Sequence, residues 1–235
     1  MILQVHGGGY TFFGPKAYRR TAYRWAKATG AAVLTVDYRL APQHAFPCAL
    51  ADVLTALRWL QRHHAGTPIV LVGDSAGGGL IAALLLTLRD RGDRQPAGAV
   101  LMSPWLDLTH RTGSIRLNRA TDYLPPMGPI TPAVLRARAA KAEGSDAPAR
   151  AHANVHTYTA NAHLAHPRVS PLYEPDLRRL APLLVQVGGA EVLRDEGCLF
   201  AARAASSSDS DGAAAAVALE IYEQQVHVFQ AFPPA

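Results

Sequence analysis

Residues 73–77 read Gly73-Asp74-Ser75-Ala76-Gly77, a G-x-S-x-G pattern. The apolar run just before it, from Pro68, predicts a strand, and the Ala- and Leu-rich stretch after it, to Arg91, predicts a helix. A serine in such a strand-to-helix turn is exposed at the carboxyl end of the strand, and small flanking residues leave room for the tight turn. The pattern predicts an α/β fold with Ser75 as nucleophile. A glycine-rich turn without chemistry is the alternative interpretation.

The rest of the chain repeats this alternation of short β-branched runs and longer helical stretches. The expected strands are 2–6, 31–37, 68–73, 97–102, 183–188 and 218–223, and the expected helices are 17–29, 46–64, 76–91 and 192–205. Alternation of this kind predicts a mostly parallel sheet with flanking helices, joined by right-handed crossovers. We therefore expect one α/β domain over residues 1–235.

Two stretches interrupt the alternation. Around residues 106–180, Pro, Gly, His and Asn are frequent and no strong strand is visible, so we interpret this part as an insertion between two strands that contributes to a lid. Residues 206–216, which read SSSDSDGAAAA, are of low complexity and are expected to form a surface loop.

Composition excludes several classes of protein. The 235 residues are 49% hydrophobic and 17% charged, and the net charge of +5 is scattered without a basic run, so no nucleic-acid partner is indicated. No apolar run is long enough to span a membrane and no targeting signal is visible, which leaves the compartment open with the cytoplasm as default. Cys48 and Cys198 lack metal-ligand spacing, so we expect buried free thiols, no metal and no cofactor.

A second glycine-rich segment, His6-Gly7-Gly8-Gly9, follows the first expected strand. Such a loop turns backbone N–H groups toward a developing oxyanion, together with the N–H of the residue after the nucleophile. We expect Gly8, Gly9 and Ala76 to form this oxyanion hole. A phosphate-binding loop is the alternative, but the Lys and Ser/Thr ending of that motif is missing.

A serine nucleophile needs a base that is oriented by an acid, and in this fold the chain order is Ser, acid, His. His227 follows the last expected strand and is the last of ten histidines. Two acids follow the strand 183–188, Glu191 in the turn that leaves it and Asp195 within the next helix. We favour Glu191, and we interpret Asp195 and Glu196 as first-turn residues that stabilise the helix N-terminus.

These motifs together resemble the hormone-sensitive-lipase family of α/β-hydrolase esterases. The resemblance rests on segments spread along nearly the whole chain, namely HGGG (6–9), DYRLAP (37–42), FP (46–47), GDSAGG (73–78), SPWLD (103–107), SPL (170–172), residues 191–197 and His227. It implies a serine carboxylesterase that hydrolyses small short- or medium-chain acyl esters through an acyl-enzyme on Ser75. In the family the acid is usually the Asp of a D-P-L-x-D-E run, where this chain has Glu191 and no proline. Asp37 and Arg39 are expected to be ion-pair or hydrogen-bond partners that support the site loops.

The resemblance also implies parts that this chain does not show. Family members carry two more strands and cap helices before the HGGG loop, and a helix after the histidine. We therefore expect an incomplete α/β-hydrolase fold with strand 31–37 at an exposed edge and one sheet face uncovered, so residues 1–235 alone should have weak activity and low solubility. An inactive fragment is one alternative, and a non-catalytic small-molecule-binding protein of this fold, like the plant gibberellin receptors, is another. The oligomeric state is not indicated.

Overall fold

A computed structural model describes residues 1–125, 155–207 and 216–232 of the chain. Within them six parallel strands form one sheet in the order β2-β1-β3-β4-β5-β6. The strands are β1 (Ile2–Val5), β2 (Val33–Thr35), β3 (Val70–Asp74), β4 (Gly98–Met102), β5 (Leu183–Gly188) and β6 (Val217–Tyr222). The described helices are α1 (Pro15–Thr29), α2 (Cys48–His63), α3 (Ala76–Asp90), α4 (Ser114–Leu117) and α7 (Arg194–Ala205), with short 3₁₀ turns η1 (Asn161–His163), η2 (Pro171–Tyr173) and η3 (Phe229–Ala231). The predicted α/β fold is confirmed.

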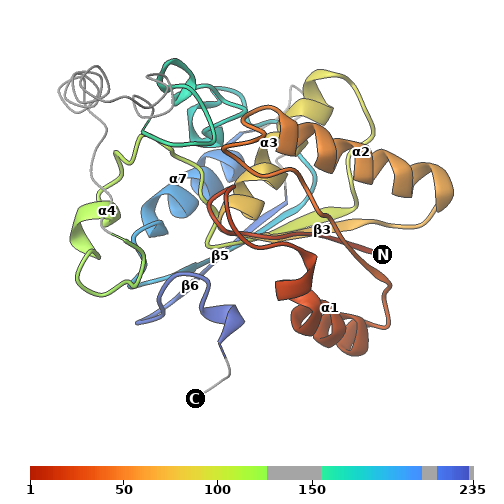
Figure 1. Ribbon diagram of the computed structural model, residues 1–235, viewed down its shortest axis with the longest axis horizontal. Helices are drawn as coiled ribbons and strands as arrows, with labels where there is room; N and C mark the ends of the chain where they lie inside the picture. Colours follow the sequence, from red (N-terminus) through yellow and green to blue (C-terminus); the bar gives the residue numbers. More distant parts are fainter. Residues whose placement is uncertain (126–154, 208–215, 233–235) are drawn as a thin grey trace.

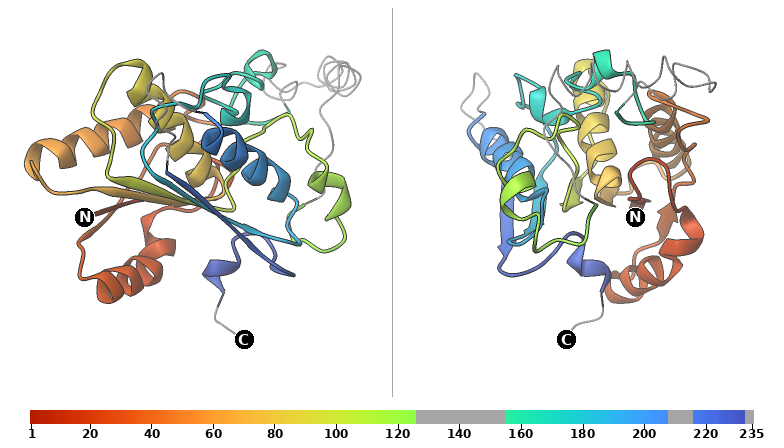
Figure 2. Two further views of the ribbon diagram at one scale, coloured as in Figure 1. Left: turned by 180° about the vertical axis from the view of Figure 1, so that it is seen from behind. Right: turned by 60° about the vertical axis from the view of Figure 1, so that its left-hand side comes forward.

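The helices cover the sheet in two layers. Helices α2, α3 and α7 lie on one face, and α1 lies on the other together with η3 (Figures 1 and 2). The main core fills the space under α3. All five leucines of this helix between Leu80 and Leu88 are at most 1% exposed. Burying one such side chain contributes about 1.5–3 kcal/mol, so α3 is the central element of the core.

Helix boundaries depart from the sequence prediction where proline determines them. α1 begins at Pro15 instead of residue 17, since proline has no N–H to leave unpaired at a helix start, and it ends at Thr29, where the capping residue Gly30 adopts a φ of 69°. α2 begins at Cys48 instead of Phe46, because the residue before Pro47 is disfavoured in helical conformation.

The sheet has two edges, β2 and β6. β2 is shorter than predicted, with only Val33–Thr35 paired to β1, because no strand in the described residues lies on its other side. Along β6 the apolar side chains of Leu219 and Ile221 are 38% and 51% exposed.

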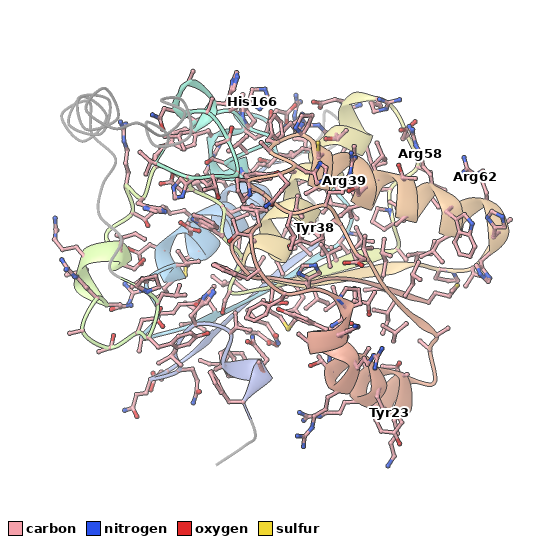
Figure 3. The ribbon with its side chains drawn as sticks, viewed as in Figure 1. Tyr23, Tyr38, Arg39, Arg58, Arg62 and His166 are labelled. Atoms are coloured by element: carbon pink, nitrogen blue, oxygen red, sulfur yellow. The ribbon has the colours of Figure 1, made fainter. Side chains whose placement is uncertain are left out.

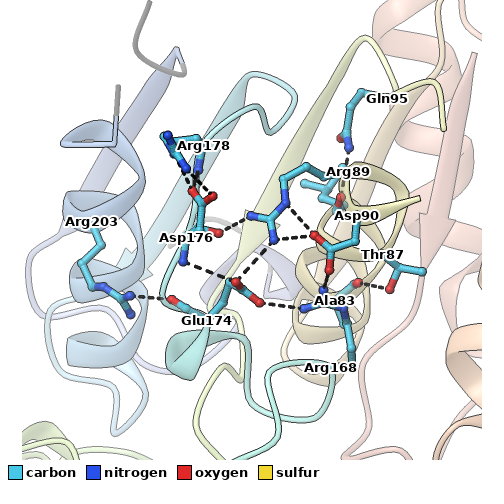
Figure 4. Close-up of polar contacts among 11 residues, drawn as sticks. Ala83, Thr87, Arg89, Asp90, Gln95, Arg168, Glu174, Asp176, Arg178 and Arg203 are labelled. Carbon is cyan, nitrogen blue, oxygen red and sulfur yellow. Dashed lines mark hydrogen bonds and ion pairs between the residues drawn. The ribbon is translucent and has the colours of Figure 1, made fainter. Parts of the chain in front are cut away.

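The predicted insertion lies between β4 and β5 and contains α4, η1 and η2, while residues 126–154 within it lie outside the described part. A network of ion pairs holds its last segment, 168–178, to the helices beneath (Figure 4). Arg89 of α3 and Arg168 both reach Glu174, at 3.3 and 3.0 Å, and Arg203 of α7 donates to backbone oxygens of the same segment. Of the predicted loop 206–216, residues 208–215 also lie outside the described part.

The predicted support of the site loops by Asp37 and Arg39 is corrected by the structure. Arg39 forms a two-pronged ion pair with Asp52 of α2, at 2.8 Å, and not with Asp37. The side chains of the consecutive residues Tyr38 and Arg39 point in different directions. Tyr38 points into the interior, while Arg39 lies at the surface beside α2 (Figure 3).

The two cysteines, Cys48 and Cys198, are free, as expected. Each is only partly buried, which differs from the buried thiols that the sequence predicts. Among the described residues, no helix combines the length and the apolar character needed to cross a bilayer.

Candidate active site

Ser75 occupies the turn between β3 and α3, in a backbone conformation that residues with a side chain rarely adopt. Its φ is 52° and its ψ is −122°. Both backbone groups of the residue are held by the end of β4 and the loop that follows it, because Ser75 N donates to Met102 O and Trp105 N donates to Ser75 O, each at 2.9 Å. Such a strained residue persists only where its surroundings fix it, and here the end of β4 and the loop after it do so.

The glycines around Ser75 are required by close packing of the backbone. A Cβ atom added to Gly77 would lie 2.2 Å from Val5 O, and one added to Gly73 would lie 2.8 Å from Gly77 C. Both distances are far below van der Waals contact. The start of α3 therefore packs directly on the end of β1, which brings the Ser75 turn next to the loop 6–9.

The loop 6–9 presents two N–H groups beside this turn. Gly8 and Gly9 have φ values of 104° and 60°, which glycine adopts at no steric cost. In the part of the chain that the structure describes, neither N–H has a hydrogen-bond acceptor. Ala76 is the first residue of α3, so its N–H has no partner within the helix. These are the three residues expected for an oxyanion hole.

His6, the first residue of the loop 6–9, packs in the interior of the protein. The ring is fully buried and stacks on Tyr38, with ring centroids 4.1 Å apart, and the Tyr38 hydroxyl donates to His6 O at 2.9 Å. Burial lowers the pKa of His6, which favours the neutral imidazole. His6 therefore serves as a packing residue of the loop.

Asp74, the residue before Ser75, connects the turn to α1. The Tyr18 hydroxyl donates to Asp74 Oδ2 at 2.8 Å and accepts from Gly7 N at 3.0 Å. Burial raises the pKa of Asp74 to about 6, although the Tyr18 hydrogen bond and the charge of His227 act in the opposite direction. No local sequence pattern indicates this contact of Tyr18, since it joins residues 56 positions apart.

Glu191 and His227 are in direct contact. Glu191 Oε2 lies 2.9 Å from His227 Nδ1, and the two side chains are 0% and 2% exposed. Glu191 Oε1 accepts from Gly188 N at 3.0 Å, which fixes the carboxylate from the end of β5. A carboxylate can only accept, so His227 Nδ1 is the donor of this bond and Nε2 points away from the carboxylate.

The other two acids considered in this region face elsewhere. Asp195 Oδ2 accepts from Ser114 N at 2.7 Å, and Asp195 Oδ1 pairs with Arg194 at 2.8 Å. Glu196 is fully buried and accepts from Leu106 N at 2.6 Å, and burial raises its pKa well above the ordinary value. Both lie in the first turn of α7 as expected, but Glu196 holds the loop after β4.

Ser75, Glu191 and His227 follow β3, β5 and β6 at the carboxyl edge of one parallel sheet. The structure brings Glu191 and His227 together, while the Ser75 hydroxyl has no hydrogen-bond partner among the described residues. The segment after His227 is bound to the loop after β4 by Ser103, whose Oγ accepts from Val228 N at 3.0 Å. Catalytic hydrogen bonds often tighten only when substrate binds.

A cavity of about 210 Å³ lies beside this site, on the α1 side of the sheet. Its lining includes Tyr18 and Trp25 of α1, together with Asp74 and Val228, which are next in the chain to Ser75 and His227. None of the three predicted triad residues lines it. In the described residues, no group of three or more His, Cys, Asp or Glu side chains is arranged to hold a metal ion.

Sequence reasoning also missed three polar side chains that contact the site. Asn118, Thr121 and Asp122 follow α4 and bind the backbone around Glu191, and Asp122 reaches His227 N as well. They lie in an irregular segment without periodicity, so no local pattern distinguishes them from ordinary loop residues.

Comparison with known proteins agrees with the fold. Residues 2–231 match a protein family described as the α/β hydrolase fold. An acetyl-hydrolase of Streptomyces hygroscopicus is 37% identical over 83% of this chain and 58% of its own length. The carboxylesterase/phospholipase LipF of Mycobacterium tuberculosis is 32% identical over 100% of this chain and 57% of its own length. This chain thus spans less than two thirds of these relatives.

A solved structure gives the same result in three dimensions. The crystal structure of an esterase from the bacterial hormone-sensitive lipase family is 35% identical and superposes with a TM-score of 0.77, over 98% of this chain and 69% of that one. The chain therefore belongs to the α/β-hydrolase fold family, in the branch that includes the hormone-sensitive-lipase esterases.

Proposed function

We propose that this protein is a serine carboxylesterase, with Ser75 as nucleophile, His227 as base and Glu191 as the acid that orients the base. The observation that carries the proposal is the buried contact between Glu191 Oε2 and His227 Nδ1, at the same sheet edge as a strained Ser75. Membership of a branch whose named relatives are esterases and acetyl-hydrolases supports ester hydrolysis.

The proposed reaction has two acyl-transfer steps. Ser75 Oγ attacks the ester carbonyl carbon while His227 Nε2 takes the hydroxyl proton, and the same proton leaves with the alcohol. Water then attacks the acyl-enzyme, giving its proton to Nε2, and the carboxylic acid departs as Ser75 recovers its proton. Glu191 stabilises the imidazolium that forms in each step.

The N–H groups of Gly8, Gly9 and Ala76 are proposed to bind the oxyanion of both tetrahedral intermediates. Their support is that neither glycine N–H has an acceptor among the residues that the structure describes, and that Ala76 stands at the start of α3. Donors that are already oriented need no reorganisation, and one such donor is worth roughly 10²–10³-fold in rate.

Short or medium acyl chains are the proposed substrates, on the support of the acetyl-hydrolase relative. The proposed partner is thus a small-molecule ester.

Covalent labelling tests the proposal directly. A fluorophosphonate reagent should label the folded chain at Ser75, and the chain should hydrolyse p-nitrophenyl acetate and butyrate. Ser75→Ala should abolish both, whereas Ser206→Ala, at the end of α7, serves as a matched serine control and should change neither. Labelling that persists in Ser75→Ala would contradict the assignment. A folded chain that binds small esters without turnover would favour the non-catalytic alternative.

A further inference from the structure

The loop between β5 and α7, residues 189–193, carries Glu191 and depends on side chains from another part of the chain. Glu191 and Val192 are 0% and 4% exposed, so the backbone groups here need protein partners. Three side chains of residues 118–122 each bind this acid loop, and together they bind one backbone group in each of the four consecutive residues 189–192. The bonds run from Asn118 Nδ2 to the carbonyl oxygens of Gly189 (3.1 Å) and Glu191 (2.8 Å), from Thr121 Oγ1 to Ala190 O (2.8 Å), and from Val192 N to Asp122 Oδ2 (2.8 Å).

Asp122 alone among these three reaches the histidine segment as well. Its second oxygen, Oδ1, accepts from His227 N at 3.3 Å and from Tyr123 N at 2.8 Å. One carboxylate therefore joins the backbone next to Glu191 to the backbone of His227. These are the two chain segments whose side chains meet at 2.9 Å.

We propose that Asp122 is a positioning residue for the Glu191–His227 pair. This inference rests on the proposed function, because it assigns Asp122 a role in that reaction. The carboxylate connects the two loops through Val192 N and His227 N, and Ser103 holds the histidine segment separately through Val228 N. A displacement of about 1 Å at a catalytic group can cost roughly 10²-fold in rate, so spacing at this point matters.

A carboxylate is suited to this position for a simple chemical reason. Its two oxygens accept from N–H groups on two different segments, while an amide has only one oxygen and a donor that repels an N–H. Asp122→Asn keeps the shape of the side chain and removes one of the two connections. Asp122→Ala removes both.

A double-mutant cycle with His227→Ala separates positioning from general stability. In the otherwise unsubstituted chain, Asp122→Asn should lower kcat for p-nitrophenyl acetate by about 10–100-fold and change KM by less than about threefold. In the His227→Ala background the same substitution should have no further effect on residual turnover, because the pair it positions is gone. A general folding defect would lower turnover in both backgrounds. Asp93→Asn, at a surface ion pair with Arg58, is the matched control and should leave kcat unchanged.

A second readout does not depend on turnover. The proton on His227 Nδ1, in a buried bond to a carboxylate, should give a far-downfield proton resonance that is lost in His227→Ala. In Asp122→Asn this resonance should broaden or disappear because the proton exchanges faster with water. If the unsubstituted chain fails to hydrolyse esters, the proposed function fails, and the resonance still decides the role of Asp122. An unchanged resonance in Asp122→Asn, its absence from the unsubstituted chain, or an equal loss of turnover in both backgrounds would overturn the inference.

Discussion

Glu191 and His227 form a hydrogen bond of 2.9 Å that solvent does not reach, since the two side chains are 0% and 2% exposed. A bond between a carboxylate and an imidazole N–H is stronger in such a site than at the surface, because little water competes for either group. The imidazole ring is thereby held in one tautomer and one orientation.

Glu191→Gln should therefore lower kcat for p-nitrophenyl acetate by about 10³–10⁴-fold, as the amide can turn its donor to Nδ1 and stabilise the wrong tautomer. Asp195→Asn should cost much less, because Asp195 binds Ser114 N and Arg194 and has no contact with His227. Circular dichroism would verify that both variants are folded. A larger loss in Asp195→Asn than in Glu191→Gln would identify Asp195 as the acid.

Two glycines of the loop 6–9, proposed as oxyanion donors, should respond differently to the same substitution. A Cβ on Gly8 would lie 2.4 Å from Phe12 O, whereas one on Gly9 would have no atom nearer than Thr11 Oγ1 at 3.8 Å. Gly8→Ala must displace the loop, so we expect at least about 10²-fold lower kcat.

Gly9→Ala should cost only about 1–2 kcal/mol of unfolding free energy, the price of a left-handed alanine, and keep kcat within about tenfold. Thermal unfolding and ester turnover of the two variants measure the contrast. Equal loss of kcat in both would show that the loop adapts to an added methyl group.

The fold was predictable because its elements are marked locally. The strand-turn-helix around Ser75 and the Ala/Leu-rich α3 carry their periodicity in consecutive residues, and parallel order follows from the alternation of elements. Residues at the carboxyl ends of neighbouring strands must share one edge, which is why Glu191 and His227 could be proposed together. Their catalytic roles stay predictions.

Contacts between distant segments could not be predicted. Tyr18 meets Asp74, and Asp122 meets His227, across 56 and 105 positions, and nothing near either residue indicates its partner. The partner of Arg39 could not be predicted either. Asp37, two positions away, was the expected partner, whereas in the structure Arg39 pairs with Asp52. Such pairs depend on how packed elements approach, which a single sequence pattern does not encode.

The ion-pair network of Figure 4 should contribute to stability through Glu174. This carboxylate has a side chain 10% exposed and lies between Arg89 and Arg168, which are 7% and 16% exposed. Glu174→Gln leaves two poorly solvated guanidinium groups with less opposite charge, so we expect a loss of about 3 kcal/mol in unfolding free energy. Urea unfolding measures it.

A surface pair provides the comparison for this network. Arg58 and Asp93 are 36% and 34% exposed, and Arg58→Gln should change stability by less than about 1 kcal/mol. A similar small change in Glu174→Gln would mean that water reaches the network and that it does not anchor segment 168–178.

Asp74 should make the stability of the fold depend on pH. Burial raises its pKa from 3.8 to about 6, so between these values the folded chain binds more protons than the unfolded chain. The unfolding free energy should therefore be highest below about pH 4 with respect to this group, and fall by up to about 3 kcal/mol as pH rises through 6. Asp74→Asn keeps an acceptor for Tyr18 and should remove this slope from the difference between the two stability curves. Tyr18→Phe should act in the opposite way, since it removes the hydrogen bond that lowers the Asp74 pKa and so extends the slope to higher pH.

Urea unfolding of the unsubstituted chain, Asp74→Asn and Tyr18→Phe between about pH 4 and pH 8 tests both signs. Parallel stability curves for the unsubstituted chain and Asp74→Asn would show that Asp74 titrates as an ordinary surface carboxylate.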